Sequence, residues 1–429
     1  MSATPAAIPR RSAAFLLGMA LLMLGANFVW ISYNNVLLPT LVERTTMEYR
    51  GLITGLIGFF GTLLGVLVSL LSGIASDRSA SPWGRRTPSL LIGTVATLPF
   101  IALAALFRQP SLAVVVVSFL GMECFTNVGN GAWWPLIVDV VPEHQRGLSS
   151  GIAGLYALIG AAMGVGLVSL LNQHGRTDAA LWVLAITLAV SGIMSAFVVR
   201  GWDTPAVAER PLDRTSLWTL LREMFRVHRL VVVFFWVVAS AFLANMALNS
   251  LQFFARYFFQ TFFPSVGPDY AFRLMGGISL ACTAAAAVGA GLLSDRIGRR
   301  RLILASMFAS GALTLVMPFV SSFTVFLVLA ALRSLATGPI VGVIPALAAD
   351  LAPRDEAGKY MAYINLSTGL ATAVASLGFG LVLTRIDRSG FMTLFVVSAA
   401  LFVAGGVLFL AKVPERQLHS SPEPGPTGC

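Results

Sequence analysis

Two ionisable residues lie deep inside apolar stretches of the sequence, and they are the first candidates for chemistry. Glu123 is the only acid midway along an apolar run, at residues 110–138, and Arg333 is the only base as deep in another run. A charged side chain in hydrocarbon is costly, so it faces a cavity, pairs with an opposite charge or changes protonation. We predict that Glu123 binds a proton and that Arg333 tunes it. A buried pair that only fixes helix packing is the alternative.

Amide side chains recur at helical spacing on similar apolar runs. Asn27, Trp30 and Asn34 are spaced i, i+3, i+7, which places them on one helix face. Amides provide both donors and acceptors, as a hydroxyl-rich neutral ligand requires, although they can also bond one helix to another. We predict that these stripes line a binding cavity. The predicted substrate-binding residues are Asn27, Trp30, Asn34, Asn127, Asn130, Asn245, Asn249 and Gln252.

Long apolar segments must position these residues. The 429 residues are 57% hydrophobic and 11% charged, whereas a soluble domain carries about 25% charged residues. Because a spanning helix needs about 20 apolar residues, we predict an all-α integral membrane protein with twelve transmembrane helices. A soluble enzyme, a disulfide-rich secreted protein and a single-span receptor are excluded. The predicted spans are 14–41, 51–75, 88–107, 110–138, 149–172, 179–199, 230–259, 270–293, 302–321, 323–349, 359–384 and 390–411.

The positive charges predict the orientation of the chain. With the N-terminus inside, 20 of the 29 Lys and Arg residues fall in the two terminal segments and the even-numbered loops. Since Lys and Arg collect in cytoplasmic loops, we expect a multi-pass protein of the cell (inner or plasma) membrane with both termini cytoplasmic. No soluble segment has a basic patch interleaved with aromatic residues, so nucleic acid is not an expected partner. The expected partners are the lipid bilayer and a small-molecule substrate.

The two halves of the chain repeat at an offset of about 218 residues. Such a repeat predicts two six-helix bundles related by a pseudo-two-fold axis normal to the membrane, with a site between them. The predicted parts are an N-terminal bundle at 1–199, a cytoplasmic linker at 200–229, a C-terminal bundle at 230–412 and a disordered cytoplasmic tail at 413–429. The matches are Gly73-x-x-x-Asp77-Arg78 with Gly291-x-x-x-Asp295-Arg296, Gly84-Arg85-Arg86 with Gly298-Arg299-Arg300, and Asp139 with Asp350.

This repeated loop motif resembles the signature of the major facilitator superfamily. The longer first copy, and the segment 141–147, are similar to the glycoside–pentoside–hexuronide and sucrose–proton symporter branch. The resemblance implies the major facilitator fold and alternating access by a monomer that is not an enzyme and needs no cofactor or metal. It also implies a cytoplasmic latch, whereas fixing the topology alone is the alternative. The implied gating residues are Gly73, Asp77, Arg78, Gly84, Arg85, Arg86 and Asp139 in the first copy, and Gly291, Asp295, Arg296, Arg299, Arg300 and Asp350 in the second.

Departures from the resembling families narrow the expected function. The interior of the second predicted span, 51–75, has no charge, so a sodium site like that of the glycoside symporters is not expected, and H+ is the expected coupling ion. The glycine run at 160–166 lacks the proline of drug–proton antiporters. We therefore predict proton symport of a small neutral polar solute, sugar- or glycoside-like. The alternatives are proton-coupled export of hydrophobic or amphipathic compounds, and a non-transporting membrane assembly factor.

Overall fold

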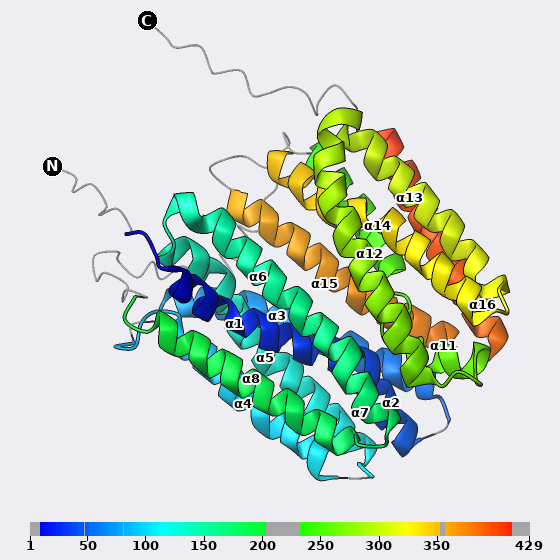
Figure 1. The fold of residues 1–429 in the computed structure, drawn as a ribbon, viewed down its shortest axis with the longest axis horizontal. Coiled ribbons are helices and arrows are strands. Elements are labelled where there is room, and N and C mark those ends of the chain that lie inside the picture. Colours follow the sequence, from blue (N-terminus) through cyan, green and yellow to red (C-terminus); the bar gives the residue numbers. More distant parts are fainter. Residues whose placement is uncertain are drawn as a thin grey trace, which may run out of the picture. The chain divides into compact units, whose positions relative to one another are not determined.

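Helices are the only regular structure in the part of the chain that is described. The computed structural model describes residues 9–46, 48–79, 81–107, 109–202, 232–351 and 357–413. A helix satisfies its backbone hydrogen bonds within itself, as a segment in hydrocarbon must. The predicted all-α class is therefore confirmed. In chain order (Figure 1) the helices are α1 (Ala13–Ser32), the π turn η1 (Tyr33–Leu37), α2 (Leu38–Thr45), α3 (Arg50–Asp77), α4 (Thr87–Leu106), α5 (Leu112–Val140), α6 (Glu143–Met163), η2 (Gly164–Val168), α7 (Ser169–Gln173), α8 (Thr177–Val199), α10 (Val232–Leu248), α11 (Ala255–Phe262), α12 (Pro268–Ile297), α13 (Arg299–Val316), η4 (Met317–Phe319), α14 (Phe323–Leu351), α15 (Ala357–Val382) and α16 (Arg388–Lys412).

The helices have the length and composition of membrane spans. Among the described residues, eleven helical stretches are long and apolar enough to cross a membrane, and α10 is a shorter apolar helix at the seventh predicted span. That span was predicted as one helix over 230–259, but a turn at 249–254 separates α10 from α11. Asn249 at the break donates its side-chain amide to the carbonyl of Asn245, and such local bonds compete with regular helix continuation.

Packing groups the chain into two compact units. Unit 1 contains 1–214, 251–277 and 376–390, and unit 2 contains 215–250, 278–375 and 391–429. The segments 251–277 and 376–390 belong to the second half of the sequence repeat, yet they pack with the first half. The division into bundles at 1–199 and 230–412 stays a prediction. Most of the predicted linker and tail lies outside the described residues.

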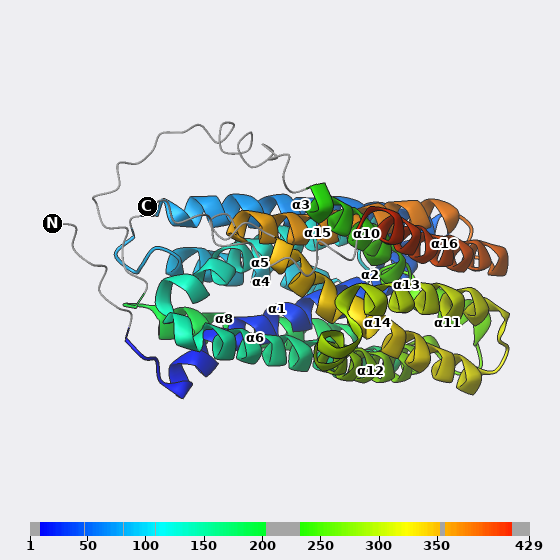
Figure 2. The same cartoon turned by 90° about the horizontal axis from the view of Figure 1, so that it is seen from above.

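The helices of unit 1 approach one another at glycines. Helix α1 packs against α6 and α8, α4 packs against α5 and α8, and α3 packs against α5 (Figure 1 and Figure 2). A Cβ atom on Gly93 of α4 would lie 2.4 Å from the backbone nitrogen of Gly129 on α5. A Cβ atom on Gly160 of α6 would lie 2.2 Å from the carbonyl oxygen of Leu24 on α1. Small residues at these points let the helix backbones touch.

Unit 2 has its own apolar core. Helix α14 packs against α13 and α10, and both of these are joined to it by buried aliphatic and aromatic side chains. The rings of Phe234 on α10 and Tyr360 on α15 meet edge to face, with centroids 4.9 Å apart. This core includes the C-terminal part of α14, from Ile340 to Ala348.

A π turn interrupts the first long helix. The backbone N–H of Leu38 bonds to the carbonyl of Tyr33, five residues earlier, where an α-helix would use four. Pro39 follows directly, and it has no N–H to donate to the carbonyl four residues before it. Single π turns within α-helices are frequent at functional sites.

Candidate functional site

The Glu123 carboxylate is buried in unit 1 and held by two amides. Its side chain on α5 is 3% exposed. Asn34 Nδ2 of η1 donates to Oε1 at 3.3 Å, and Asn127 Nδ2 donates to Oε2 at 3.2 Å. On α3, Gly65 faces the carboxylate, and a Cβ atom there would lie 3.0 Å from Oε2. Two N–H donors suit an ionised carboxylate, and no ion pair to Glu123 is formed among the described residues.

Asn34 differs from the other residues of its stripe. Asn27 and Trp30 are half-buried, whereas Asn34 is fully buried. Its Nδ2 donates both to Glu123 and to the carbonyl of Trp30, 2.9 Å away. Its Oδ1 is buried without a hydrogen-bond partner in the described part of the chain. Asn34 was predicted to bind substrate, and in the structure it bonds directly to Glu123, the predicted proton site.

Arg333 lies on α14 in unit 2. Its Nε is buried and finds no hydrogen-bond partner among the residues that are described. The neighbouring polar side chains Ser334 and Thr337 bond to carbonyls of their own helix. Since Glu123 belongs to unit 1 and Arg333 to unit 2, the predicted partnership between them stays a prediction.

The remaining amides of the predicted binding stripes mostly bond to their own helices. Asn27, Asn245 and Asn249 each donate Nδ2 at 2.9 Å to the carbonyl four residues earlier, which leaves the amide oxygen open to other donors. Asn130 on α5 is half-buried. Gln252 is buried in the turn before α11, and neither polar atom of its side chain has a partner among the described residues. An unpaired buried amide is available for a ligand.

The first loop motif forms a compact charged cluster, here named the motif cluster. It consists of Ser76, Asp77, Arg85, Arg86 and Asp139 in unit 1. The Arg86 guanidinium, 2% exposed, donates to Asp77 and Asp139 at 2.5 Å and to Ser76 Oγ at 2.8 Å. Arg85 also donates to Asp139 at 2.5 Å. The charged residues that the loop motif identified in the sequence therefore contact one another in the structure.

Two glycines and the exposed Arg78 are the other residues of the first motif. Gly84 has a φ of 112°, a conformation that residues with a side chain rarely adopt, so the loop can turn toward Arg85 only with glycine there. A Cβ atom on Gly73 would lie 3.4 Å from the carbonyl of Gly131, at the contact of α3 and α5. Arg78 follows the end of α3 and its N–H bonds to the carbonyl of Ala75.

The second loop motif, in unit 2, is partly different. Arg299 pairs with Asp350, the same partnership as Arg85 with Asp139 in the first copy. Arg300, at the position of Arg86, instead donates to the carbonyls of Val413 and Leu410 at the end of α16. Gly291 and Arg296 are exposed, and the side chain of Asp295 lies outside the described part. The pairing of an arginine with the carboxylate at the end of the fourth helix of the repeat is thus retained, and among the described side chains Arg300 bonds to backbone carbonyls.

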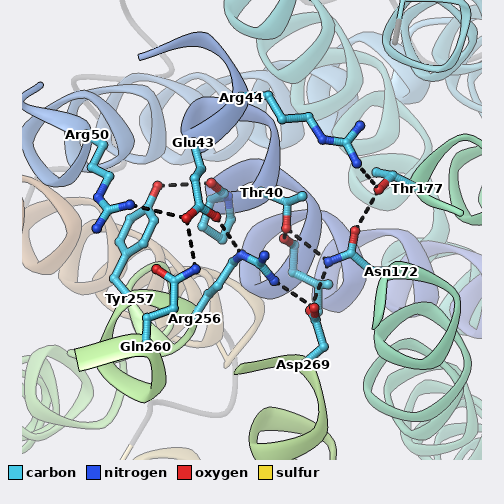
Figure 3. A network of polar contacts seen from close by, with 12 residues as sticks. Thr40, Glu43, Arg44, Arg50, Asn172, Thr177, Arg256, Tyr257, Gln260 and Asp269 are labelled. Carbon is cyan, nitrogen blue, oxygen red and sulfur yellow. Dashed lines mark hydrogen bonds and ion pairs between the residues drawn. The ribbon is translucent and has the colours of Figure 1, made fainter. Parts of the chain in front are cut away.

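A second charged cluster lies around the end of α2, and the sequence analysis missed it (Figure 3). We name it the α2 network. It comprises Thr40, Glu43, Arg44, Arg50, Asn172, Thr177, Arg256, Tyr257, Gln260 and Asp269, all in unit 1.

Arg256 joins the two acids of this network. Its Nε donates to Glu43 at 2.9 Å, and its Nη1 donates to Asp269 at 2.8 Å (Figure 3). Arg50 and Gln260 also donate to Glu43, at 3.2 and 2.8 Å. Arg256 therefore lies between two carboxylates at the end of α2.

Neutral side chains complete the α2 network. Asn172 Nδ2 donates to Asp269 at 2.8 Å and to Thr40 Oγ1 at 3.2 Å, and its Oδ1 accepts from Thr177. The Tyr257 hydroxyl donates to the carbonyl of Pro39 at 3.0 Å. The separation of Tyr257 and Pro39 is 218 residues, the offset of the sequence repeat, and this was the signal that could have revealed the network.

Comparison with known proteins gives a family match over most of this chain and relatives that match about a third of it. The family model of the Major Facilitator Superfamily matches residues 12–290 and 246–428. The chain is 28% identical over 174 residues to the general alpha-glucoside permease of Schizosaccharomyces pombe, a match covering 37% of this chain and 30% of the permease. It is 32% identical over 129 residues to the inner membrane transport protein YajR of Escherichia coli, covering 30% and 27%. The chain thus spans less than a third of either relative in these matches.

A solved structure shows the same fold. The bacterial homologue of the human lysosomal transporter Spinster, in an inward-facing and unoccupied conformation, superposes with a TM-score of 0.75 at 13% sequence identity. The superposition covers 96% of this chain and all of the homologue. The predicted major facilitator fold of twelve helices is confirmed by this likeness and by the family match.

Proposed function

Because this chain belongs to the Major Facilitator Superfamily, we propose that it imports a small neutral polar solute, sugar- or glycoside-like, by symport with protons. The chain is a multi-pass membrane transporter and not an enzyme. The observation that carries the proposal is the Glu123 carboxylate, buried on α5 and held by Asn34 and Asn127 without a paired cation among the described residues.

Glu123 is the proton carrier in this proposal. A carboxylate at this depth is stable as an ion while both amides donate to it, and it becomes neutral when it takes a proton. A neutral Glu123 no longer needs its donors, so protonation changes which polar groups around it are satisfied. Arg333, whose Nε has no partner in the described chain, tunes this step as an ion pair or through bound solute.

The proposed solute follows from the polar groups that are left open. Among the described residues, the amide oxygens of Asn27, Asn245 and Asn249 accept no side-chain hydrogen bond that is observed, and both polar atoms of the Gln252 amide lack a partner. Such groups match hydroxyls, which both donate and accept. A relative of the chain is named as an alpha-glucoside permease, and this supports a sugar-like solute here.

The remaining parts of the proposal concern access and location. The two loop motifs act as cytoplasmic latches during alternating access, with Arg86 and Arg299 as the arginines that hold the carboxylates. The protein works as a monomer in the cell membrane, with both termini in the cytoplasm, as the distribution of Lys and Arg favours.

Uptake by proteoliposomes tests the coupling. With an inward proton gradient and a panel of radiolabelled sugars and glycosides, the wild-type protein should accumulate one of them. Glu123→Gln should lose accumulation and keep exchange of labelled for unlabelled solute, because exchange does not require net proton movement. Glu143→Gln, a change of an exposed acid on α6, is the matched control and should behave as wild type. Full gradient-driven accumulation by Glu123→Gln would exclude Glu123 as the coupling residue.

The same vesicles separate the other functions. Gradient-driven movement of an amphipathic dye, with no movement of any sugar, would replace import by export. If no compound moves and the Glu123→Gln and Arg333→Ala variants keep the cellular phenotype, the chain is a membrane assembly factor with a transporter fold.

A further inference from the structure

The α2 network fastens together segments from the two sequence repeats. Glu43 lies in the first repeat, and Arg256 and Asp269 lie in the second, although all three pack in unit 1. Tyr257 bonds to Pro39, its own equivalent in the other repeat. Two equivalent residues can touch only close to the axis that relates the repeats, because each lies at the same distance from it. The network therefore joins the two repeats within unit 1 close to that axis, a contact here named the closure.

The helix that carries this closure also carries the contact to Glu123. Residues Ala13–Thr45 form one continuous helical stretch, in which the π turn Tyr33–Leu37 separates α1 from α2. Asn34 at the start of the π turn contacts the carboxylate, and Pro39, Thr40 and Glu43 on α2 contact the network. Glu43 is only nine positions beyond Asn34 along this stretch.

Protonation of Glu123 changes the hydrogen bonds that the Asn34 side-chain amide can form. A protonated carboxyl has an O–H to donate, so a donor that faces it, such as Asn34 Nδ2, loses its acceptor. Asn34 Oδ1 is buried without a donor among the described residues, and the new O–H can satisfy it if the amide turns. Turning the amide also withdraws Nδ2 from the Trp30 carbonyl, in the helical turn that leads into the π turn.

We propose that Asn34 is a positioning residue that transmits the protonation of Glu123, through the π turn at Tyr33–Leu37, to the closure formed by the α2 network. The π turn is the element with two arrangements, because one extra backbone residue in the turn can be retained or released as the Asn34 amide changes partner. This inference rests on the proposed function, since it needs Glu123 to take a proton. It adds Asn34 as the residue whose hydrogen bonds change on protonation, and the α2 network as the contact that changes in consequence.

The other ionisable groups on the described helices around Glu123 lie mainly at helix ends. Helix α4, which packs against α5, has none. Tyr33, next to Asn34, is the one on the π turn, and its ring lies 5.7 Å from that of Phe119 on α5. The ionisable and charged groups on α5 and the described elements packed against it are Tyr33, Glu43, Arg44, Arg50, Asp77, Cys124, Asp139, Glu143, His144, Arg146 and Tyr156.

A double-mutant cycle with hydrogen–deuterium exchange tests the transmission. Glu123→Gln presents an amide donor where the ion accepts, so it mimics the protonated acid at constant pH. In the purified full-length protein it should raise amide exchange in segments 33–45 and 255–269 about fivefold, the low end of coupling between distinct sites. In the Asn34→Ala background the same change should have no further effect. An equal rise in both backgrounds would overturn the role of Asn34.

Asn35 provides the matched control. Like Asn34, it lies in the π turn and donates Nδ2 at 2.9 Å to the carbonyl four residues earlier, but it has no bond to Glu123. Asn35→Ala should keep the full effect of Glu123→Gln on exchange. If Asn35→Ala abolishes that effect as Asn34→Ala does, the π turn needs both amides for its structure, and the specific role of Asn34 is excluded.

The pH profile of uptake is the second readout. Without the Asn34 donor the ionised carboxylate is less stable, so the pH of half-maximal uptake should rise by about one unit, the size expected for one charge-assisted hydrogen bond. Asn35→Ala should leave it unchanged. An unshifted profile in Asn34→Ala, together with lost accumulation in Glu123→Gln, would overturn this inference and leave the proposed function standing. Unimpaired accumulation in Glu123→Gln would instead overturn the proposed function itself.

Discussion

The two charged clusters at the two ends of α3 are built in opposite ways. The motif cluster at Asp77 uses residues from a short loop and the end of α5, and its central Arg86 is buried. The α2 network at Arg50 joins residues more than 200 positions apart, and its Arg256 retains partial exposure. The motif cluster lies wholly within the first repeat, whereas the α2 network ties the first repeat to the second.

Because of this difference, we expect the loss of an ion pair to have different effects in the two clusters. Charges that stay within one repeat hold a loop against a helix end, so a variant that removes them weakens that repeat as well as the proposed latch. Charges that join the repeats must separate whenever that end of the molecule opens. Damage to the motif cluster should therefore lower the free energy of unfolding, and damage to the α2 network should change the balance between closed and open forms.

The largest expected effect on stability is that of Arg86→Met. Removing one member of a buried ion pair costs about 3 kcal/mol when its partners are partly exposed, as Asp77 and Asp139 are. The melting temperature in detergent should fall clearly. Arg300→Met, at the equivalent position in the second repeat, should cause a smaller fall, because Arg300 bonds only to backbone carbonyls in the described chain. Equal losses in both variants would contradict the comparison.

Arg256→Gln should act on conformation more than on stability. It removes the cation shared by Glu43 and Asp269, so the closed form should lose about 1–2 kcal/mol, or roughly tenfold in its equilibrium with the open form. A cysteine at Thr54, which is fully buried beside Tyr257, would report the change. In a protein with its three native cysteines replaced by serine, the labelling rate by a water-soluble thiol reagent should rise about tenfold.

Arg273→Gln is the control for this experiment. Arg273 lies on α12 near Asp269, but it bonds to Gln173 at an exposed position outside the α2 network. Its loss should leave the labelling of Thr54→Cys unchanged. A comparable rise in the Arg273 variant, or no rise in the Arg256 variant, would show that the α2 network does not hold this end closed.

The sequence predicted one of the two clusters, and the reason is physical. Arg85, Arg86 and Asp77 lie within ten residues of one another, so a loop motif reveals them. Glu43, Asn172 and Asp269 each stand alone at the end of an apolar run, and only the packing of distant helices brings them together. Apolar length predicted the spans, but it did not predict the break between α10 and α11, because apolar composition does not report a local turn within a span.

Asp387 should have the smallest effect, and it tests whether a carboxylate outside the α2 network also matters. It precedes α16, is fully exposed, and accepts hydrogen bonds from the N–H of Gly390 at 2.6 Å and the hydroxyl of Ser389 at 3.0 Å. These bonds, that of Gly390 first, hold the pKa of Asp387 below its ordinary 3.8. A lowered folded-state pKa stabilises the protein above the ordinary value, and the contribution is lost as the pH falls through the folded pKa. Asp387→Ala should therefore lower the melting temperature slightly at neutral pH, and the difference should vanish in strong acid. Asp387→Asn, which keeps an acceptor without the charge, should show less pH dependence.

The same two variants serve as a control for the labelling experiment. Asp387 takes no part in the ion pairs of Arg256 with Glu43 and Asp269, so neither variant should change the labelling of Thr54→Cys. A change there would mean that charge at this end of the molecule acts broadly, and that the α2 network has no special part in closure.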